Sequence, residues 1–288
     1  MSAKSLSRGL FDSRAPRIAL AYRKYRDRLR NAQLLRDNAP KATPWGFRIY
    51  GDAGLALADS REQSGEAGLF LRLADQADLV VDVGAHIGIF TLLALSRGVP
   101  TIAIEPSPPN LIQLYRNLQL FDGGQVEVIP VALADYVGLS PLYGGGPGGQ
   151  GASLRRGWGG VRSTYTNTVP VHTLDGLLSS RVAGKRLLIK VDAEGSEMPI
   201  LRGAQTLLAN DPPPAWILEI GLTENFVGQL NPDFRRIFEV FWTFGYRATC
   251  VEAMGRPVFE SDVDAWIAER NRGFWNMNYL FEKLPARA

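Results

Sequence analysis

The chain has 288 residues, of which 45% are hydrophobic and 21% are charged, the composition of a folded globular protein. One cysteine, Cys250, and two histidines exclude a disulfide framework, a cysteine-based zinc site and a metal cluster built from histidines alone. The sequence shows neither a secretory signal nor an apolar run long enough to span a bilayer. We therefore expect a cytoplasmic protein without a transmembrane segment.

Charge is distributed unevenly along the chain. Residues 1–45 hold 11 basic and 3 acidic residues, a net charge of +8, whereas the remainder is mildly acidic under a formal total of +3. A uniformly basic nucleic-acid binder is excluded by this pattern, and we expect no nucleic-acid partner. We interpret residues 1–45 as a basic helical arm with a linker, and residues 46–288 as one domain.

The basic arm is predicted to be helical from about Pro16 to Asp37. Apolar residues recur there every three or four positions and form one stripe: Ile18, Tyr22, Tyr25, Leu29 and Ala32. This stripe would pack on the body of the protein or on a second subunit, so a homo-oligomer stays open. The alternative is weak contact with an anionic membrane surface or a polyanionic substrate; we favour packing because the stripe lacks Trp and Phe.

The body of the chain begins with a hairpin expected over 47–58 and a helix over 62–77. Short apolar runs then alternate with helical segments, which predicts an α/β fold with a mostly parallel sheet covered on both faces. The expected strands are 79–83, 101–104, 126–132, 187–191, 216–220, 247–252 and 276–282, and the helices are 87–96, 110–120 and 234–244. Extra strands at 139–143 and 168–174 flank a glycine-rich segment, 144–151, which is either a surface loop or a lid over a substrate.

A nucleotide site is predicted where the first of these strands ends. Gly84 and Gly88 follow the strand, let a ligand approach the main chain, and lead into a new helix. Glu105 ends the next strand and can accept both hydroxyls of a ribose. His86 occupies the place of the second glycine of a dinucleotide fingerprint, so S-adenosylmethionine, which has one ribose and no phosphate, fits better than a dinucleotide.

Several blocks of the sequence are similar to the FkbM-type S-adenosylmethionine-dependent methyltransferases. They are VVDVGAHIGIFT at 80–91, IAIEPSPPN at 102–110, VHTLDGLL at 171–178, LLIKVDAEGSEMPILRGA at 187–204 and WILEIG at 216–221. The resemblance implies a class I, Rossmann-like methyltransferase domain that methylates a hydroxyl of a small molecule, such as a sugar or a secondary metabolite, or of a glycan. It also implies a set of cofactor-binding residues: Asp82, Gly84, His86, Gly88, Glu105, Ser107 and Asp135. His86 replaces the asparagine that is usual in the family.

The candidate chemistry lies after the strand at 187–191. Alternation along a strand places Lys190 and Asp192 on the same side, at the edge of the sheet where ligands bind. Asp192 is the first candidate for the base that takes a proton from a hydroxyl. Lys190 would orient Asp192 or, if neutral, act itself, and His172 is a further candidate for the base, although a structural role is more common for a lone histidine.

Metal binding and two other functions remain open at this point. Asp192, Glu194 and Glu219 could form an oxygen-ligand site for Mg²⁺. A nicotinamide-dependent dehydrogenase could use the same nucleotide-binding end, but the glycine fingerprint is incomplete. A binding module without catalysis is the third hypothesis, and the carboxylates at the strand ends weigh against it.

Overall fold

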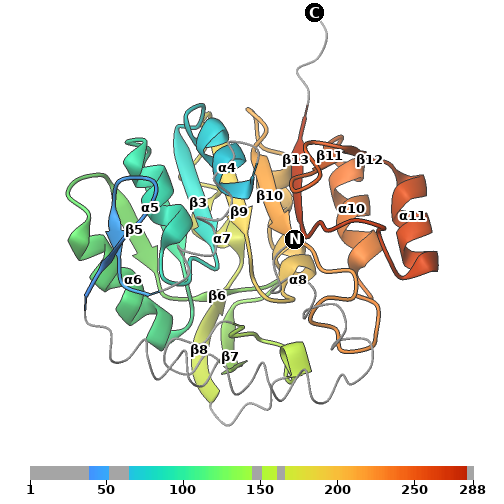
Figure 1. Ribbon diagram of the computed structural model, residues 1–288, viewed down its shortest axis with the longest axis horizontal. Helices are drawn as coiled ribbons and strands as arrows, with labels where there is room; N and C mark the ends of the chain where they lie inside the picture. The colour runs from blue at the N-terminus through green and yellow to red at the C-terminus, as the bar shows by residue number, and fades with distance from the viewer. Residues whose placement is uncertain (1–38, 52–64, 145–150, 161–165, 284–288) are drawn as a thin grey trace, which may run out of the picture.

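A computed structural model describes residues 39–51, 65–144, 151–160 and 166–283. Within these residues the main sheet has eight strands in the order β12-β11-β13-β10-β9-β3-β4-β5 (Figure 1). Five neighbouring strands are parallel: β5 (Val126–Ile129), β4 (Thr101–Ile104), β3 (Leu79–Val83), β9 (Leu187–Val191) and β10 (Ala215–Glu219). The remaining three pair antiparallel with their neighbours: β13 (Asn278–Glu282), β11 (Arg247–Cys250) and β12 (Pro257–Val258).

The central strands are those with the most continuous apolar sequence. Every residue of β3 and of β9 is buried, as expected for parallel strands covered on both faces. Each of these strands carries one ionisable residue, Asp82 in β3 and Lys190 in β9, and the two residues are paired across the ladder. The predicted parallel α/β sheet is thereby confirmed, and its two charged interior positions lie side by side.

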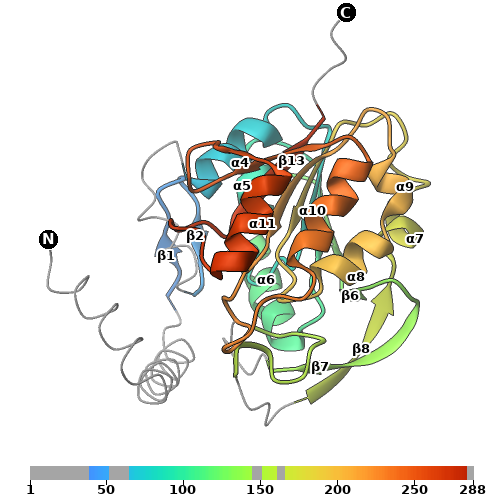
Figure 2. The same cartoon turned by 90° about the vertical axis from the view of Figure 1, so that its right-hand side faces the viewer.

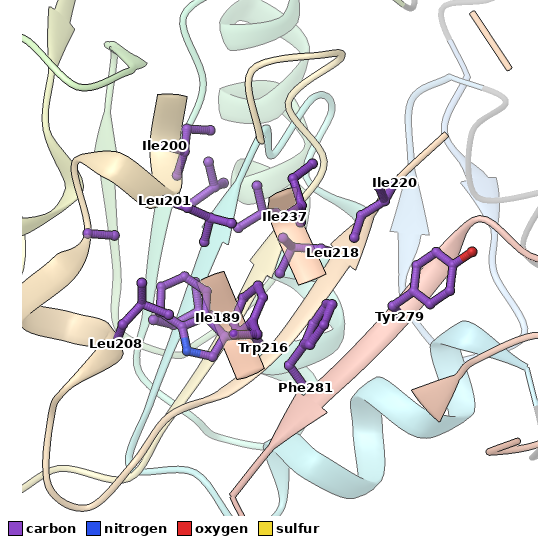
Figure 3. Packing of buried hydrophobic residues seen from close by; sticks show 14 of the residues in the cluster. Ile189, Ile200, Leu201, Leu208, Trp216, Leu218, Ile220, Ile237, Tyr279 and Phe281 are labelled. Carbon is purple, nitrogen blue, oxygen red and sulfur yellow. The ribbon is translucent and has the colours of Figure 1, made fainter. Parts of the chain in front are cut away.

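Helices cover both faces of the main sheet (Figures 1 and 2). One face carries α4 (Glu66–Ala74), α5 (Ile89–Ser96) and α6 (Pro108–Leu120). The other carries α7 (Leu174–Leu178), α8 (Glu197–Arg202), α9 (Gln205–Leu208), α10 (Phe234–Thr243) and α11 (Glu260–Glu269). Figure 3 shows the larger core on this second face, where Trp216 and Phe281 lie among aliphatic side chains. The Phe241 and Phe281 rings stack there, with their centroids 3.8 Å apart.

A small second sheet, in the order β6-β8-β7, follows β5. It consists of β6 (Ala132–Leu133), β8 (Thr166–His172) and β7 (Gly138–Tyr143), and Figure 1 shows it below the main sheet. The predicted strand 126–132 is split in two at Pro130, which has no N–H to donate to a ladder. The predicted strand 168–174 ends at His172, because the Thr173 side chain accepts from the N–H of Gly176 and caps α7.

The N-terminal hairpin lies earlier than predicted. β1 (Lys41–Ala42) pairs antiparallel with β2 (Arg48–Ile49), and Gly46 has a φ of 87° in the connecting turn, a conformation that favours glycine. The predicted arm helix, residues 52–64 and most of the glycine-rich segment lie outside the described residues. In the part of the chain that the structure describes, no helix is long and apolar enough to cross a membrane.

Candidate functional site

A cavity of about 290 Å³ lies at the edge of the main sheet where β3, β4, β9 and β10 end. Ligands of open α/β sheets bind at this edge because the strands end there and the loops diverge. Six of the residues predicted from sequence line the cavity: Gly84, His86, Glu105, Asp192, Glu194 and Glu219. In the strand order, residues after β3 and β4 lie on one side, and the carboxylates after β9 and at the end of β10 lie on the other.

Gly84 is required by the close approach of two strand ends. Its φ is 78°, and a Cβ atom at this position would overlap the main-chain oxygen of Asp192. Gly88 also has a positive φ, 93°, and precedes α5, where a Cβ atom would lie 2.5 Å from Leu114 Cδ1. Gly84 therefore lines the cavity, whereas Gly88 is needed for packing of α5 against α6.

Glu105 is 3% exposed and is held by three donors. The main-chain N–H groups of His86 and Ser107 each donate at 2.8 Å, and Asn110 Nδ2 donates at 3.2 Å. Burial raises the pKa of Glu105 to about 7, although these hydrogen bonds act in the opposite direction. The carboxylate is thus fixed in one orientation beside the cavity.

Two buried polar atoms lie beside Glu105. Ser107 Oγ and Asn110 Oδ1 have no hydrogen-bond partner among the residues that the structure describes. Buried polar groups are nearly always paired, so Asn110 Oδ1 is suited to a bound ligand with a complementary group, whereas Ser107 is fully buried and is not part of the cavity lining. Asn110 lines the cavity. It was not predicted from the sequence as a site residue, although it is the last residue of the block at 102–110 that is similar to the FkbM family.

Four residues predicted to bind the cofactor lie outside the cavity lining: Asp82, Gly88, Ser107 and Asp135. Asp82 is buried in β3 and accepts a hydrogen bond of 2.6 Å from Thr91 Oγ1, which ties the strand to α5. Asp135 is exposed, with its Oδ2 3.6 Å from Arg202 Nη1.

Lys190 forms a buried ionic cluster next to the cavity. Its Nζ lies 3.0 Å from Glu66 Oε1 and 3.7 Å from Asp192 Oδ2, and 4.4 Å from the centroid of the Phe90 ring. The predicted placement of Lys190 and Asp192 on the same side is therefore correct. Burial alone would lower the pKa of Lys190, but the neighbouring carboxylates outweigh burial and raise it. Lys190 is thus suited to orienting Asp192 and not to acting as a neutral base.

Glu194 and Glu219 complete an acidic edge with Asp192. Repulsion from Asp192, followed by burial, raises the pKa of Glu219 well above its ordinary value. Burial and the charge of Asp192 raise the pKa of Glu194 to about 7, against a hydrogen bond from Trp158 that lowers it. Glu66 and Trp158 were missed from sequence, because each lies far along the chain from the residue that it contacts.

The metal and histidine hypotheses gain no support from this geometry. In the described ranges, no group of three or more His, Cys, Asp or Glu side chains is arranged to hold a metal ion, so the possible Mg²⁺ site at Asp192, Glu194 and Glu219 is not supported. His172 lies in β8 of the small sheet, outside the cavity lining, with its Nδ1 3.1 Å from the main-chain oxygen of Thr173.

The strand order and the position of the cavity define the class of protein. Parallel strands in the order β5-β4-β3-β9-β10, with the final strand inserted antiparallel beside β10, form the class I methyltransferase fold. The model of the methyltransferase FkbM domain matches residues 82–248. The chain belongs to the FkbM methyltransferase family, which confirms the resemblance seen in the sequence.

Individual relatives are more distant. Methyltransferase 1 of Beauveria bassiana (strain ARSEF 2860) is 32% identical over 143 residues, which cover 43% of this chain and 57% of the relative. The match therefore spans little more than half of that relative. Similar solved structures include the SAH-bound Podospora anserina methyltransferase PaMTH1, at 10% identity and a TM-score of 0.41, covering 89% of this chain and 94% of that one. Another is the SAM-dependent methyltransferase from Agrobacterium tumefaciens, at 8% identity and a TM-score of 0.43, covering 84% and 68%.

Proposed function

We propose that the protein transfers the methyl group of S-adenosylmethionine to a hydroxyl of a sugar, glycan or secondary metabolite. The observation that carries this proposal is the division of the cavity between Glu105 on one side and three carboxylates on the other. A fixed carboxylate at the end of β4 suits the two hydroxyls of a ribose. The acidic edge suits a cationic sulfonium and supplies a proton acceptor for an alcohol, which is a poor nucleophile.

The residues of the chain have separate tasks in this proposal. Glu105 binds the ribose, and the main chain at Gly84 and His86 forms the wall beside it. S-adenosylmethionine supplies an activated methyl group. Asp192, the candidate base predicted from sequence, and Glu194 both line the cavity where the acceptor hydroxyl must lie. Lys190 holds Asp192 in place by the ion pair described above.

Calorimetric titration of the full chain with S-adenosylmethionine, S-adenosylhomocysteine and NAD tests this function. We expect both sulfur compounds to bind at one site per chain and NAD to show no binding. NAD binding without binding of S-adenosylhomocysteine would support a dehydrogenase instead. A folded protein that binds none of the three would contradict the proposal and support a binding module without catalysis.

A further inference from the structure

The segment at 151–160, which we call the strap, contacts the loop after β9. Ser153 Oγ donates a hydrogen bond of 2.7 Å to the main-chain oxygen of Glu194. Trp158 Nε1 donates a hydrogen bond of 2.6 Å to Glu194 Oε2. The strap therefore holds both the main chain and the side chain of one residue at the cavity, although it lies 36 to 41 residues earlier in the chain.

The main chain at Glu194 needs such support. Glu194 has a φ of 50°, in the left-handed region that residues other than glycine rarely adopt. The next residue, Gly195, has a φ of 92°, and a Cβ atom there would lie 2.5 Å from the indole ring of Trp158. The indole thus lies directly against the main chain, and only glycine allows this approach.

The indole of Trp158 is itself fixed by its neighbours. Its ring meets the edge of Phe226 at a centroid distance of 5.0 Å, and the guanidinium of Arg155 lies 5.7 Å from the centroid of the indole. Phe226 belongs to the loop after β10, so the indole is held between the strap and a second loop of the site. A donor fixed in this way determines where its acceptor oxygen lies.

This arrangement leaves one oxygen of Glu194 for a ligand. Oε2 accepts from Trp158, whereas Oε1 has no hydrogen-bond partner among the described residues, and Glu194 lines the cavity. Asp192 differs, because its carboxylate lies beside the buried cation of Lys190. The Asp192 carboxylate is thus engaged by a cation, whereas Glu194 keeps an oxygen at the cavity that can accept a proton from a ligand.

We propose that Glu194 contacts the acceptor hydroxyl and takes its proton, and that Trp158 is the positioning residue that aims this carboxylate. The proposal rests on the proposed methyl transfer. The hydroxyl oxygen forms a bond to the methyl carbon, and the carbon–sulfur bond breaks with its electron pair going to sulfur. The hydroxyl proton passes to Glu194 Oε1. Asp192 stays in its ion pair with Lys190, with Oδ2 3.7 Å from Nζ.

A double-mutant cycle separates positioning from a general structural effect. Trp158→Phe keeps an aromatic ring but removes the N–H, and Trp275→Phe, at a tryptophan that is 68% exposed, is the matched control. The assay measures methyl transfer from tritiated S-adenosylmethionine to the most active member of a panel of methyl glycosides and phenols. We expect Glu194→Gln to lower kcat about 10²-fold and Trp158→Phe about 10-fold, with S-adenosylhomocysteine affinity unchanged.

The double variant Trp158→Phe/Glu194→Gln tests whether Trp158 acts through Glu194. If Trp158 acts through Glu194, the double variant should be no slower than Glu194→Gln alone. Independent, multiplying losses would overturn the positioning role. A larger loss of kcat in Asp192→Asn than in Glu194→Gln would overturn the assignment of Glu194.

A spectroscopic experiment tests the contact between Trp158 and Glu194 without an acceptor substrate. In the ¹H–¹⁵N spectrum, the indole resonance that disappears in Trp158→Phe should shift in Glu194→Gln, and the control Trp275 resonance should not. An unchanged Trp158 resonance would overturn the proposal. A wild-type protein that fails to bind S-adenosylhomocysteine would instead contradict the proposed function, and this result can be distinguished from the indole result.

Discussion

At the scale of single residues, the site depends on ionisable groups whose burial is costly and is offset in part by hydrogen bonds from neighbouring donors. Glu105 is the clearest case, since its carboxylate is almost completely buried and is held by two main-chain donors and one side-chain donor. Such a group is retained at the expense of stability, because a buried carboxylate loses its hydration. Because Glu105 also lines the cavity, the proposed role in ribose binding would account for its retention.

Glu105→Ala should weaken the binding of S-adenosylhomocysteine by about 2–3 kcal/mol. This is the scale expected when hydrogen bonds between a charged group and two hydroxyls are lost. Calorimetry on the folded variant measures the change, and Glu260→Ala, at an exposed position in α11, serves as the control. An unchanged affinity in a folded Glu105→Ala protein would remove Glu105 from the ribose site.

Lys190→Met should destabilise the protein by about 3–5 kcal/mol, because it leaves Glu66 and Asp192 without the buried cation that pairs with them. Urea denaturation measures this change in the free energy of unfolding. The double variant Lys190→Met/Glu66→Leu should recover part of the loss, since it removes one of the stranded charges. A single variant as stable as the wild type would mean that the ion pair contributes nothing to the fold.

At the scale of elements, the sequence predicts best where a strand is a continuous apolar run. The bounds of β3, β4 and β9 were predicted to the residue, because each run is fully buried and is bounded by polar or turn-forming residues. The break between β5 and β6 at Pro130 was missed, since the flanking residues are apolar on both sides. The turn at Gly46 was missed because the preceding prolines indicated a linker.

The candidate site was predictable only in part, for a related reason. Glu105 and Asp192 each follow a strand and Glu219 is the last residue of one, and the carboxyl ends of parallel strands meet at one edge of a sheet. Glu66 and Trp158 contact the site from segments that lie far from it in the sequence, so no local sequence pattern indicates these contacts. The ion pair of Glu66 with Lys190 and the hydrogen bond of Trp158 with Glu194 depend on tertiary packing, which a pattern of single residues does not contain.

The division of the chain into an arm and a domain gives a prediction for a whole segment. Deletion of residues 1–37 should leave S-adenosylhomocysteine affinity unchanged, because the segment precedes every cavity-lining residue and differs from the body in charge. Calorimetry on the truncated and full chains compares the two affinities directly. A truncated chain that folds but no longer binds would show that the arm forms part of the site and that the division is incorrect.

At the scale of the whole molecule, burial shifts the pKa values of several carboxyl groups in the same direction. Burial raises the pKa of Glu105, of Glu194 and of Glu197 to about 7. Between the ordinary glutamate pKa of about 4.5 and 7, the folded state therefore keeps protons that the unfolded state has released. A folded state that binds more protons loses stability as pH rises.

We therefore expect the free energy of unfolding to fall by roughly several kcal/mol between pH 5 and pH 8. Urea denaturation at a series of pH values, at constant ionic strength, measures this slope. Glu197→Gln should make the slope shallower, since Glu197 is 6% exposed and is one of the three groups. Stability that increases steadily from pH 5 to pH 8 would show that these carboxyl groups are ionised in the folded protein throughout this range.

The position of β13 has a consequence for how the chain is made. This strand comes last among the described elements, yet it lies between β10 and β11 and pairs with both. A ribosome that has synthesised β10 and β11 has produced two strands whose facing edges have no partner. Unpaired apolar edges promote association with other chains. The nascent protein should thus require protection by a chaperone until residues 278–282 have emerged, and a stop codon shortly before them should yield insoluble product.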